Sequence, residues 1–331
     1  GEDLTIFGDG SKQERGLLGI NYTKQERGYR WSVFVSPLFV PEFGPSFKVE
    51  NGTVTTANPW MSTPPTSGKV NGNETPFKYE LAEIDYADLV LNPSIAGYLA
   101  TETGPYELRF AYAYKPINKI FLGAPVRQSI DDIGISPLEV TIHPRVMYHN
   151  MFSAEVSYQN KAGWKNFFNA TFESPNRDST PEDWVTQETE DALIVTGYLG
   201  RDIDRYGTHI YASAMKNFGG DTTDGGQFAA DESFFERRYQ YLEAVKTGVK
   251  AQKARLFGKP VSTGLHATYD FAQRGVIFST DAAFAVSKNL IFEFSADLLG
   301  LVDNAKADIE NGFIRNYRSN DRVQGGVSYV F

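Results

Sequence analysis

The sequence predicts an all-β protein, a transmembrane antiparallel up-and-down β-barrel of about 14 strands with short periplasmic turns and long extracellular loops. Three observations predict this fold. Apolar and polar residues alternate with a period of two along most of the chain, as in strands with one apolar and one polar face. Aromatic residues are frequent, with 24 Phe, 18 Tyr and 4 Trp among 331 residues. The connections between the alternating runs tend to be short and long in alternation, as in a barrel whose two rims differ.

The composition excludes several classes of protein. The formal net charge is −9 and the pI is about 5.1, which argues against nucleic acid as the main partner. The chain has no cysteine, so disulfide bonds and thiolate metal sites are excluded. No stretch approaches the ~20 apolar residues of a membrane-spanning helix. A mean hydropathy of −0.36 fits a barrel with a wet interior.

The first residues of the chain precede any alternating run. We expect residues 1–15 to form a separate N-terminal segment inside the lumen and residues 16–331 to form the barrel. Its stretch LTIF, residues 4–7, is apolar for a solvated tail, and Gly8 and Gly10 permit tight bends. A disordered tail is the alternative. Inside the lumen, the segment would obstruct the pore through the residues Leu4, Ile6 and Phe7.

The placement of the next runs is open. Both ends of such a barrel are expected on the periplasmic side, so the number of strands should be even. Residues 16–24 and 29–39 are the best candidates for the first two strands. Segment 41–84 is too long for a periplasmic turn. It could be an outer loop, in which case the first two strands pair differently from this assignment.

Twelve further strands are predicted after about residue 85. In the run 289–300, Leu290 and Phe294 share the apolar face, whereas Glu293 lies on the polar face. The last run ends on Phe331, with apolar residues at most alternate positions back to Val323. The predicted strands are 88–100, 106–115, 137–149, 151–160, 163–173, 190–200, 206–216, 238–254, 260–272, 275–287, 289–300 and 322–331.

The lengths of the connections assign the two rims. Every second connection, counted from 287–289, is a tight turn, and these turns are predicted to lie on one side of the barrel. The long polar connections then lie on the other side, among them 174–189, 217–237 and 301–321. Short turns at the periplasmic rim and longer loops outside are the rule for bacterial barrels.

The polar face of the strands supplies the candidate residues for solute contact. Acids and bases are mixed along it, which argues against strong ion selectivity and favours a neutral, hydroxylated solute. A sugar needs planar donors and acceptors together with aromatic faces, although a general pore would show a similar mixture. The predicted lining residues are Tyr98, Arg109, Glu139, Arg145, Phe167, Tyr198, Tyr211, Lys246, Lys250, Asp270, Asp281 and Glu293.

The sequence offers little support for catalysis or for a metal site. His143, His209 and His266 are predicted to face inward, where polar lining is the commoner role. No G-x-S-x-G or H-E-x-x-H motif occurs, so we expect no enzyme and no catalytic residue. The acidic stretches 181–191 and 219–238 could gather Ca²⁺, but they lack the spacing of a calcium loop and fit solvated loops better. No metal and no cofactor is predicted.

The terminal Phe331, the apolar alternation back to Val323 and about 14 strands resemble Gram-negative outer-membrane porins. The chain length and the N-terminal segment resemble the monomeric oligosaccharide diffusion channels of the cyclodextrin type, whose N-terminal segment sits in the lumen. The resemblance implies a place in the bacterial outer membrane, in contact with its lipid and lipopolysaccharide. It also implies a monomer whose Phe331 is recognised by the barrel-assembly machinery.

These observations predict an outer-membrane channel for passive diffusion of a bulky, mostly neutral solute, such as a cyclodextrin-type oligosaccharide. Residues 1–15 would be a displaceable constriction. One alternative is a barrel enzyme that acts on outer-membrane lipid, which a histidine-dependent lipid hydrolysis would favour. Another is a transporter of hydrophobic compounds with an N-terminal plug, which an apolar lateral opening would favour.

Overall fold

The structure is a computed structural model and shows an all-β protein. The helices among the described residues, α1 (Tyr86–Val90) and α2 (Phe313–Tyr317), are each five residues long. No described helix is long and apolar enough to cross a membrane. The structure describes residues 18–40, 47–61, 63–70, 73–118, 120–127, 137–176, 184–203, 207–220, 222–225, 239–302 and 312–329.

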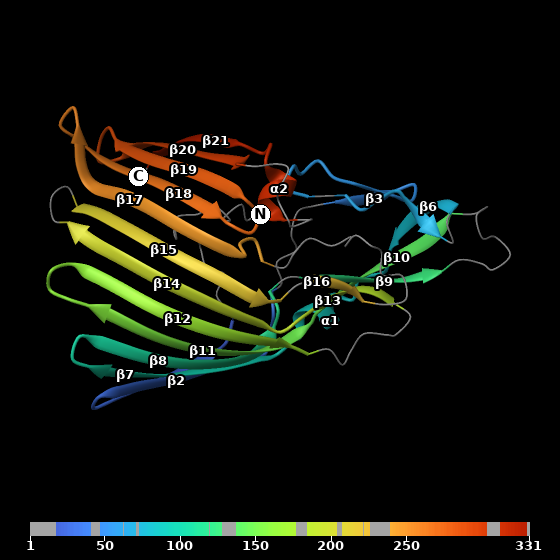
Figure 1. Cartoon of the computed structure of the whole chain (residues 1–331), viewed down its shortest axis with the longest axis horizontal. Helices are drawn as coiled ribbons and strands as arrows, with labels where there is room; N and C mark the ends of the chain where they lie inside the picture. The colour runs from blue at the N-terminus through green and yellow to red at the C-terminus, as the bar shows by residue number, and fades with distance from the viewer. Residues whose placement is uncertain are drawn as a thin grey trace.

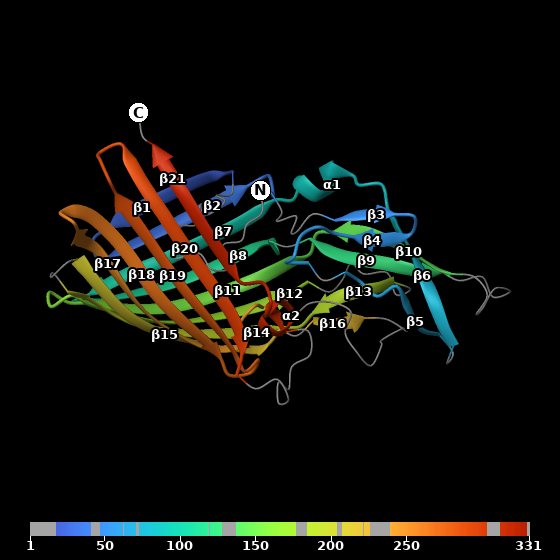
Figure 2. The ribbon, with the colours of Figure 1, turned by 90° about the horizontal axis from the view of Figure 1, so that it is seen from above.

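Thirteen strands form one antiparallel sheet, the wall, in which consecutive wall strands pair with each other. Figures 1 and 2 show the wall as a tilted, strongly curved sheet. The predicted all-β, up-and-down antiparallel architecture is confirmed. The wall strands are β1 (Ile20–Glu26), β2 (Tyr29–Ser36), β7 (Ser94–Thr103), β8 (Tyr106–Pro116), β11 (Tyr148–Gln159), β12 (Trp164–Pro175), β14 (Ala192–Ile203), β15 (Thr208–Gly219), β17 (Glu243–Leu256), β18 (Lys259–Asp270), β19 (Gly275–Ala285), β20 (Leu290–Leu301) and β21 (Arg322–Tyr329).

The two rims of the wall differ as predicted. At the short-turn rim, the strands are joined by residues 27–28, 104–105, 160–163, 204–207, 257–258 and 286–289. At the long-loop rim, the connections are 37–93, 117–147, 176–191, 220–242, 271–274 and 302–321. The first turn is made by Gly28, whose φ of 92° favours glycine. Segment 41–84 therefore belongs to the long-loop rim, and β1 and β2 form a hairpin with each other.

The wall has thirteen described strands where about 14 were predicted. The difference arises from the run 137–149. Its first part is β10 (Leu138–Arg145), which pairs outside the wall, and the wall resumes only with β11 at Tyr148. In each of the two sheets, one face is more buried than the other. The alternation of apolar and polar residues along a strand is therefore the same in both sheets.

The first and the last wall strands run in the same direction, because the described wall has thirteen antiparallel strands. β1 starts at the long-loop rim, so the described strands do not meet the expectation of an even number. Within the described part of the chain, no ladder pairs β1 with β21.

A second sheet and a hairpin are built from the long connections, and Figure 1 shows them beyond the long-loop rim. Val54, Tyr79 and Ile142 form a buried cluster there, against which Phe47 and Leu122 pack. β6 and β10 pair in parallel. The second sheet contains, in spatial order, β16 (Thr222–Gly225), β13 (Trp184–Thr189), β9 (Phe121–Arg127), β10, β6 (Asn73–Leu81) and β5 (Ser67–Val70), and the hairpin is β3 (Lys48–Glu50) with β4 (Thr53–Thr55).

The wall has an apolar outer face and a polar inner face. Residues that pair directly across antiparallel strands share a face, so the register identifies continuous rows. One outer row, the apolar belt, runs through Tyr22, Val33, Gly97, Tyr112, Phe152, Phe172, Leu193 and Phe218. Its side chains other than Gly97 are 38% to 58% exposed. The adjacent inner row contains Ser32, Tyr98, Ala111, Ser153 and Thr171.

Candidate functional site: the inner face of the wall

A pocket of about 380 Å³ lies on β2, β7, β8 and β11, and we call it the Tyr98 pocket. The guanidinium carbons of Arg30 and Arg109 lie 5.8 and 6.0 Å from the centre of the Tyr98 ring. Alanines leave the space between the larger side chains. The other inward residues that line the pocket are Asn21, Ser32, Phe34, Ala96, Ala111, Ala113, Met151 and Ser153.

The charges beside Tyr98 are balanced. The Arg109 guanidinium lies 3.0 Å from a carboxylate oxygen of Glu107 and 3.7 Å from one of Glu155. Arg30 lies 3.4 Å from the same oxygen of Glu107. Two cations therefore face two carboxylates, so this part of the inner face has little net charge. Such a surface can offer hydrogen bonds to a neutral solute without strongly selecting an ion.

A row of neighbouring rings lies on β12, β14, β15 and β18, stacked from Phe167 to Tyr211 and tilted by 41° between Tyr211 and His266. The ring centres of Phe167 and Tyr198 are 5.1 Å apart, those of Tyr198 and Tyr211 are 5.9 Å apart, and those of Tyr211 and His266 are 5.8 Å apart. Gly248 pairs directly with both Tyr211 and His266. A Cβ at Gly248 would lie 2.7 Å from the Tyr211 ring, so the absence of a side chain lets that ring lie against the wall.

Two chains of polar contacts hold these rings. In one chain, Tyr198 Oη lies 2.5 Å from His209 Nε2, and His209 Nδ1 lies 2.6 Å from Asp202 Oδ1. In the other, Tyr211 Oη lies 2.6 Å from His266 Nδ1. Each tyrosine hydroxyl can donate a hydrogen bond to the unprotonated nitrogen of a neutral imidazole, which satisfies both hydroxyl donors. The contacts fix the orientations of the rings.

The second chain continues to Asp281, and the first to a lysine. His266 Nε2 lies 3.4 Å from Asp281 Oδ1. Lys165 Nζ lies 2.7 Å from Asp202 Oδ2. Lys165 and Asp202 therefore neutralise each other beside the rings. The described residues contain no group of three or more His, Cys, Asp or Glu side chains that could hold a metal ion.

Most of the predicted lining residues share the inner face of the wall. Lys250 pairs with His209 and Gly264 on neighbouring strands. Glu293 on β20 accepts a hydrogen bond from Ser328 Oγ at 3.2 Å. The predicted residues on this face are Tyr98, Arg109, Phe167, Tyr198, Tyr211, Lys246, Lys250, Asp281 and Glu293.

Asp270 faces inward as predicted but cannot contact a solute. Its side chain is fully buried. Asp270 Oδ2 accepts a hydrogen bond from the Leu242 backbone N–H at 2.8 Å, and Oδ1 accepts one from the Gln273 N–H at 2.9 Å. Asp270 therefore anchors the end of a long connection to the wall.

Glu139 and Arg145 are in β10 of the second sheet, so the prediction that they line the wall is wrong. Glu139 pairs with Lys78 at 3.6 Å. Burial lowers the pKa of Arg145 below its usual value. His143, also predicted to face inward, is in the same strand. The period of two identifies a strand but not the sheet that it joins.

A cap at the long-loop rim was not predicted from the sequence. Phe313, Ile314 and Tyr317 of α2 pack on Ile277 and Leu299 of the inner face. The apolar residues of α2 have the spacing of a helix, which is the signal that could have indicated it.

Two other connections contact the cap, the long connection 37–93 through Trp60 and the four-residue turn 271–274 through Gln273. The Trp60 ring centre lies 6.2 Å from that of Phe313 and 5.4 Å from that of Tyr317. Gln273, nearly fully buried, accepts a hydrogen bond from the Ile314 N–H at 2.9 Å and donates one to the Gln240 carbonyl at 2.8 Å. The cap thus covers part of the inner face at the long-loop rim. The predicted constriction residues Leu4, Ile6 and Phe7 lie outside the described residues.

Comparison with known proteins adds little. No protein family model and no curated protein matches the chain. Among solved structures, the chain is similar to a mutant of the ferric enterobactin receptor from Pseudomonas aeruginosa, with a TM-score of 0.40 and 10% sequence identity. The match covers 84% of this chain and 40% of that one. At this level of similarity, function has to be inferred from the residues of the chain itself.

Proposed function

We propose that this protein is an outer-membrane channel for passive diffusion of a bulky, mostly neutral solute, and not an enzyme. The observation that carries the proposal is that the wall has an apolar outer face and a polar inner face. The exposed apolar belt from Tyr22 to Phe218 would be unfavourable in water and is favourable against hydrocarbon. The opposite face carries hydroxyl, amide and charged groups that water can solvate. This is the arrangement of a barrel with lipid outside and solvent inside.

An oligosaccharide, such as a cyclodextrin, is the solute class that we propose. The Tyr98 pocket combines an aromatic ring with hydroxyl and amide groups, and its charges are balanced. The stacked rings of Phe167, Tyr198 and Tyr211 add flat apolar surface. Sugar rings present C–H faces to aromatic groups and hydroxyl groups to polar ones, so both features suit them.

Single-channel recording with linear and cyclic sugars tests the proposal. We expect a sugar to block the conductance, and Tyr98→Ala to weaken the block several-fold. Tyr98→Phe keeps the ring and should retain most of the block. Phe168→Ala is the matched control, because Phe168 is an outward aromatic residue that is 53% exposed. A conductance that no sugar blocks would refute the choice of solute, and a barrel without conductance would refute the channel.

We further propose that residues 1–15, which the structure does not describe, constrict the lumen until a solute displaces them. A few kcal/mol of solute binding would be sufficient for a nearly complete shift of population. Removing residues 1–15 should raise the open conductance and leave the unfolding free energy nearly unchanged. If conductance and solute flux both stay the same, the segment does not act as a constriction.

The remaining parts of the proposal concern location and partners. We propose that the protein is a monomer in the bacterial outer membrane, in contact with phospholipid and lipopolysaccharide. Phe331 would be recognised by the barrel-assembly machinery. The basis is the apolar belt together with the difference between the rims, since short turns face the periplasm in bacterial barrels.

A transporter of hydrophobic compounds is a second candidate, which one observation favours. Among the described strands, β1 and β21 form no ladder with each other. Large apolar side chains lie on these two strands, with Ile20 80%, Val323 68% and Val327 63% exposed. A compound that is soluble in lipid could leave sideways between such strands. Faster uptake of an apolar aromatic compound than of sugars into vesicles holding the protein would favour this candidate.

A further inference from the structure

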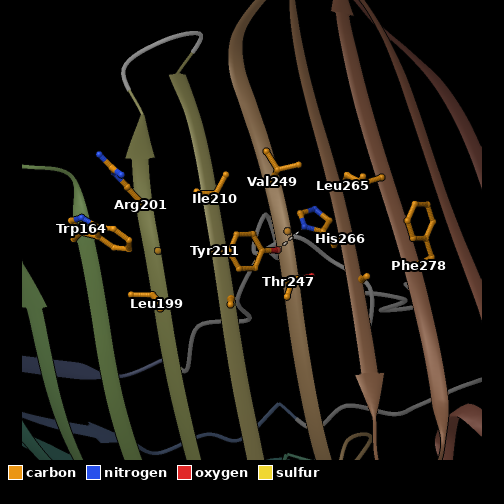
Figure 3. A pocket seen from close by; sticks show the side chains of 14 residues that line it. Trp164, Leu199, Arg201, Ile210, Tyr211, Thr247, Val249, Leu265, His266 and Phe278 are labelled. Carbon is orange, nitrogen blue, oxygen red and sulfur yellow. Dashed lines mark hydrogen bonds between the residues drawn. The ribbon is translucent and has the colours of Figure 1, made fainter.

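We propose that the outer face of the wall holds a glycerophospholipid, with one acyl chain in a groove over β14 to β19 and the phosphate on Arg201. The proposal rests on the proposed function, because the groove meets lipid only if the wall spans a membrane. The groove has a volume of about 480 Å³. Figure 3 shows the side chains that line it.

Two adjacent outer rows form the groove. The first consists of the small residues Ala212, Thr247 and Ala267, which pair directly with one another. The second consists of the larger residues Ile210, Val249 and Leu265, which are 41%, 37% and 44% exposed. The groove lies between the two rows, above the backbone of Gly200 and Gly248. It is a depression in an otherwise convex apolar surface.

The length of the groove suits one acyl chain. It extends from Leu199 on β14 to Phe278 on β19, across four spacings between neighbouring strands. Four spacings correspond to about 19 Å. One leaflet of a bilayer has a hydrocarbon depth of about 15 Å, half of the core. The groove crosses the strands, which are tilted by roughly 40° in such barrels, so its length of about 19 Å spans only about 12 Å of depth and an extended acyl chain fits along it within one leaflet.

The end of the groove on β14 supplies a site for a phosphate. Arg201 is exposed and follows Leu199 on the outer face, two residues before β14 ends at the short-turn rim. Its guanidinium carbon lies 5.2 Å from the centre of the Trp164 ring, which pairs with it across the strands. Within the described part of the chain, no carboxylate forms a salt bridge with Arg201.

The chemistry of this pair identifies the headgroup. Trp and Arg are the residues that anchor at the boundary between hydrocarbon and headgroups. A guanidinium binds a phosphate with two parallel hydrogen bonds, and the Trp164 ring holds it in place. The apolar groove and the cation at its end together match a phospholipid, whose acyl chain and phosphate are covalently linked.

Native mass spectrometry of the purified full chain in mild detergent, titrated with dioleoylphosphatidylglycerol, tests the site. We expect one retained lipid for the wild type. Arg201→Gln should weaken retention roughly tenfold or more, because a hydrogen bond between charged groups is lost. Ala267→Leu should fill the groove and weaken it similarly. A heat-shift on gel electrophoresis verifies that each variant is a folded barrel.

Two matched controls complete the test. Arg255→Gln removes another exposed cation near the short-turn rim, and Ala154→Leu enlarges an outer alanine away from the groove. Both should retain lipid as the wild type does. The proposal is overturned if Arg201→Gln and Ala267→Leu retain the lipid as the wild type does. It is also overturned if the only effect of these changes is to convert a dimer into a monomer, because the groove would then hold a second copy of the chain.

Conductance separates this proposal from the channel itself. Because Arg201 and Ala267 face outward, we expect both variants to conduct and to be blocked by sugar as the wild type is. Loss of lipid retention with normal conductance supports the groove. If the two variants retain lipid and conduct normally, the groove proposal is wrong and the channel proposal is unaffected. If the wild type does not conduct, the channel proposal is wrong and the lipid result is unaffected.

Discussion

At the scale of single residues, glycines decide where the aromatic rings of the inner face lie. Gly248 pairs with Tyr211 on one side and His266 on the other, and it leaves the space that both rings occupy. A Cβ there would lie 2.6 Å from His266 Nδ1. The hydrogen bond between Tyr211 and His266 therefore depends on a residue that takes no part in it.

Gly248→Ala should destabilise the protein by about 1–3 kcal/mol, because the two rings have to move away from the new methyl group. The matched control is Gly197→Ala on the outer face, where a Cβ would meet no atom within 4 Å. We expect that change to stay within about 0.5 kcal/mol. Urea unfolding from lipid vesicles measures both. Equal effects at the two positions would contradict the role of Gly248.

A second single residue, Tyr79, should make the second sheet sensitive to alkaline pH. Tyr79 is 7% exposed and donates a hydrogen bond to the Pro65 carbonyl at 2.7 Å. Burial raises its pKa to about 12. The folded state thus favours the neutral phenol. Its contribution to stability is complete below about pH 10, the pKa of an unfolded tyrosine, and is lost as the pH rises towards 12.

We expect the stability of the second sheet to fall between about pH 10 and pH 12 by up to about 3 kcal/mol. Tyr79→Phe should remove this loss, at a cost of about 1 kcal/mol at neutral pH for the missing hydrogen bond. Hydrogen exchange of β6 and β10 measures both effects. An unchanged pH dependence in Tyr79→Phe would show that another group causes the loss.

At the scale of elements, each wall strand has an apolar outer face and a polar inner face, which the proposed function assigns to lipid and to solvent. On β18, Leu265 is 44% exposed on the outer face, whereas its neighbour His266 is 5% exposed on the inner face. On β20, Phe294 faces outward and is 48% exposed, and Ser295 faces inward. The alternation in the sequence corresponds directly to these two faces.

Leu265→Arg or Phe294→Arg should destabilise the membrane-embedded protein by about 2–4 kcal/mol near the bilayer midplane, because an outward cation is placed in hydrocarbon. Ser295→Arg is the matched control and should cost far less, since its side chain can reach solvent inside. Equilibrium refolding into lipid vesicles compares the three. Equal costs for Phe294→Arg and Ser295→Arg would contradict the assignment of the faces.

At the scale of the whole molecule, β21 forms one edge of the described wall. β21 pairs with β20 from Arg322 to Tyr329, and its other edge forms no described ladder with β1. An edge strand in a membrane has unpaired backbone groups, so the strand has to be placed correctly during assembly. Phe331, the last residue, lies outside the described residues.

Deleting Phe331 should lower the amount of assembled barrel in the membrane, because we propose that the assembly machinery recognises this residue. Phe331→Tyr keeps an aromatic ring and should restore most of the assembly. The fraction of protein that migrates as a heat-modifiable barrel measures the effect. Normal levels after the deletion would contradict the role of Phe331.

The sequence by itself determined the class of fold, the faces of the strands and the difference between the rims. These features are local: a strand with one solvated face shows its alternation in its own residues, and a short connection shows its length. The inward positions of Tyr98, Tyr198 and Tyr211 followed from the same alternation.

Only the tertiary structure decided which sheet each strand joins and which polar residues stay accessible. Glu139 lies on the polar side of an alternating run, as Glu293 does. Its strand β10, however, pairs with β6 and β9, and such long-range pairing does not change the alternation of apolar and polar residues. Asp270 reads as a lining residue, yet the end of a long connection covers it. The cap formed by α2 and Trp60 joins segments far apart in the chain, so their packing could not be read from either segment alone.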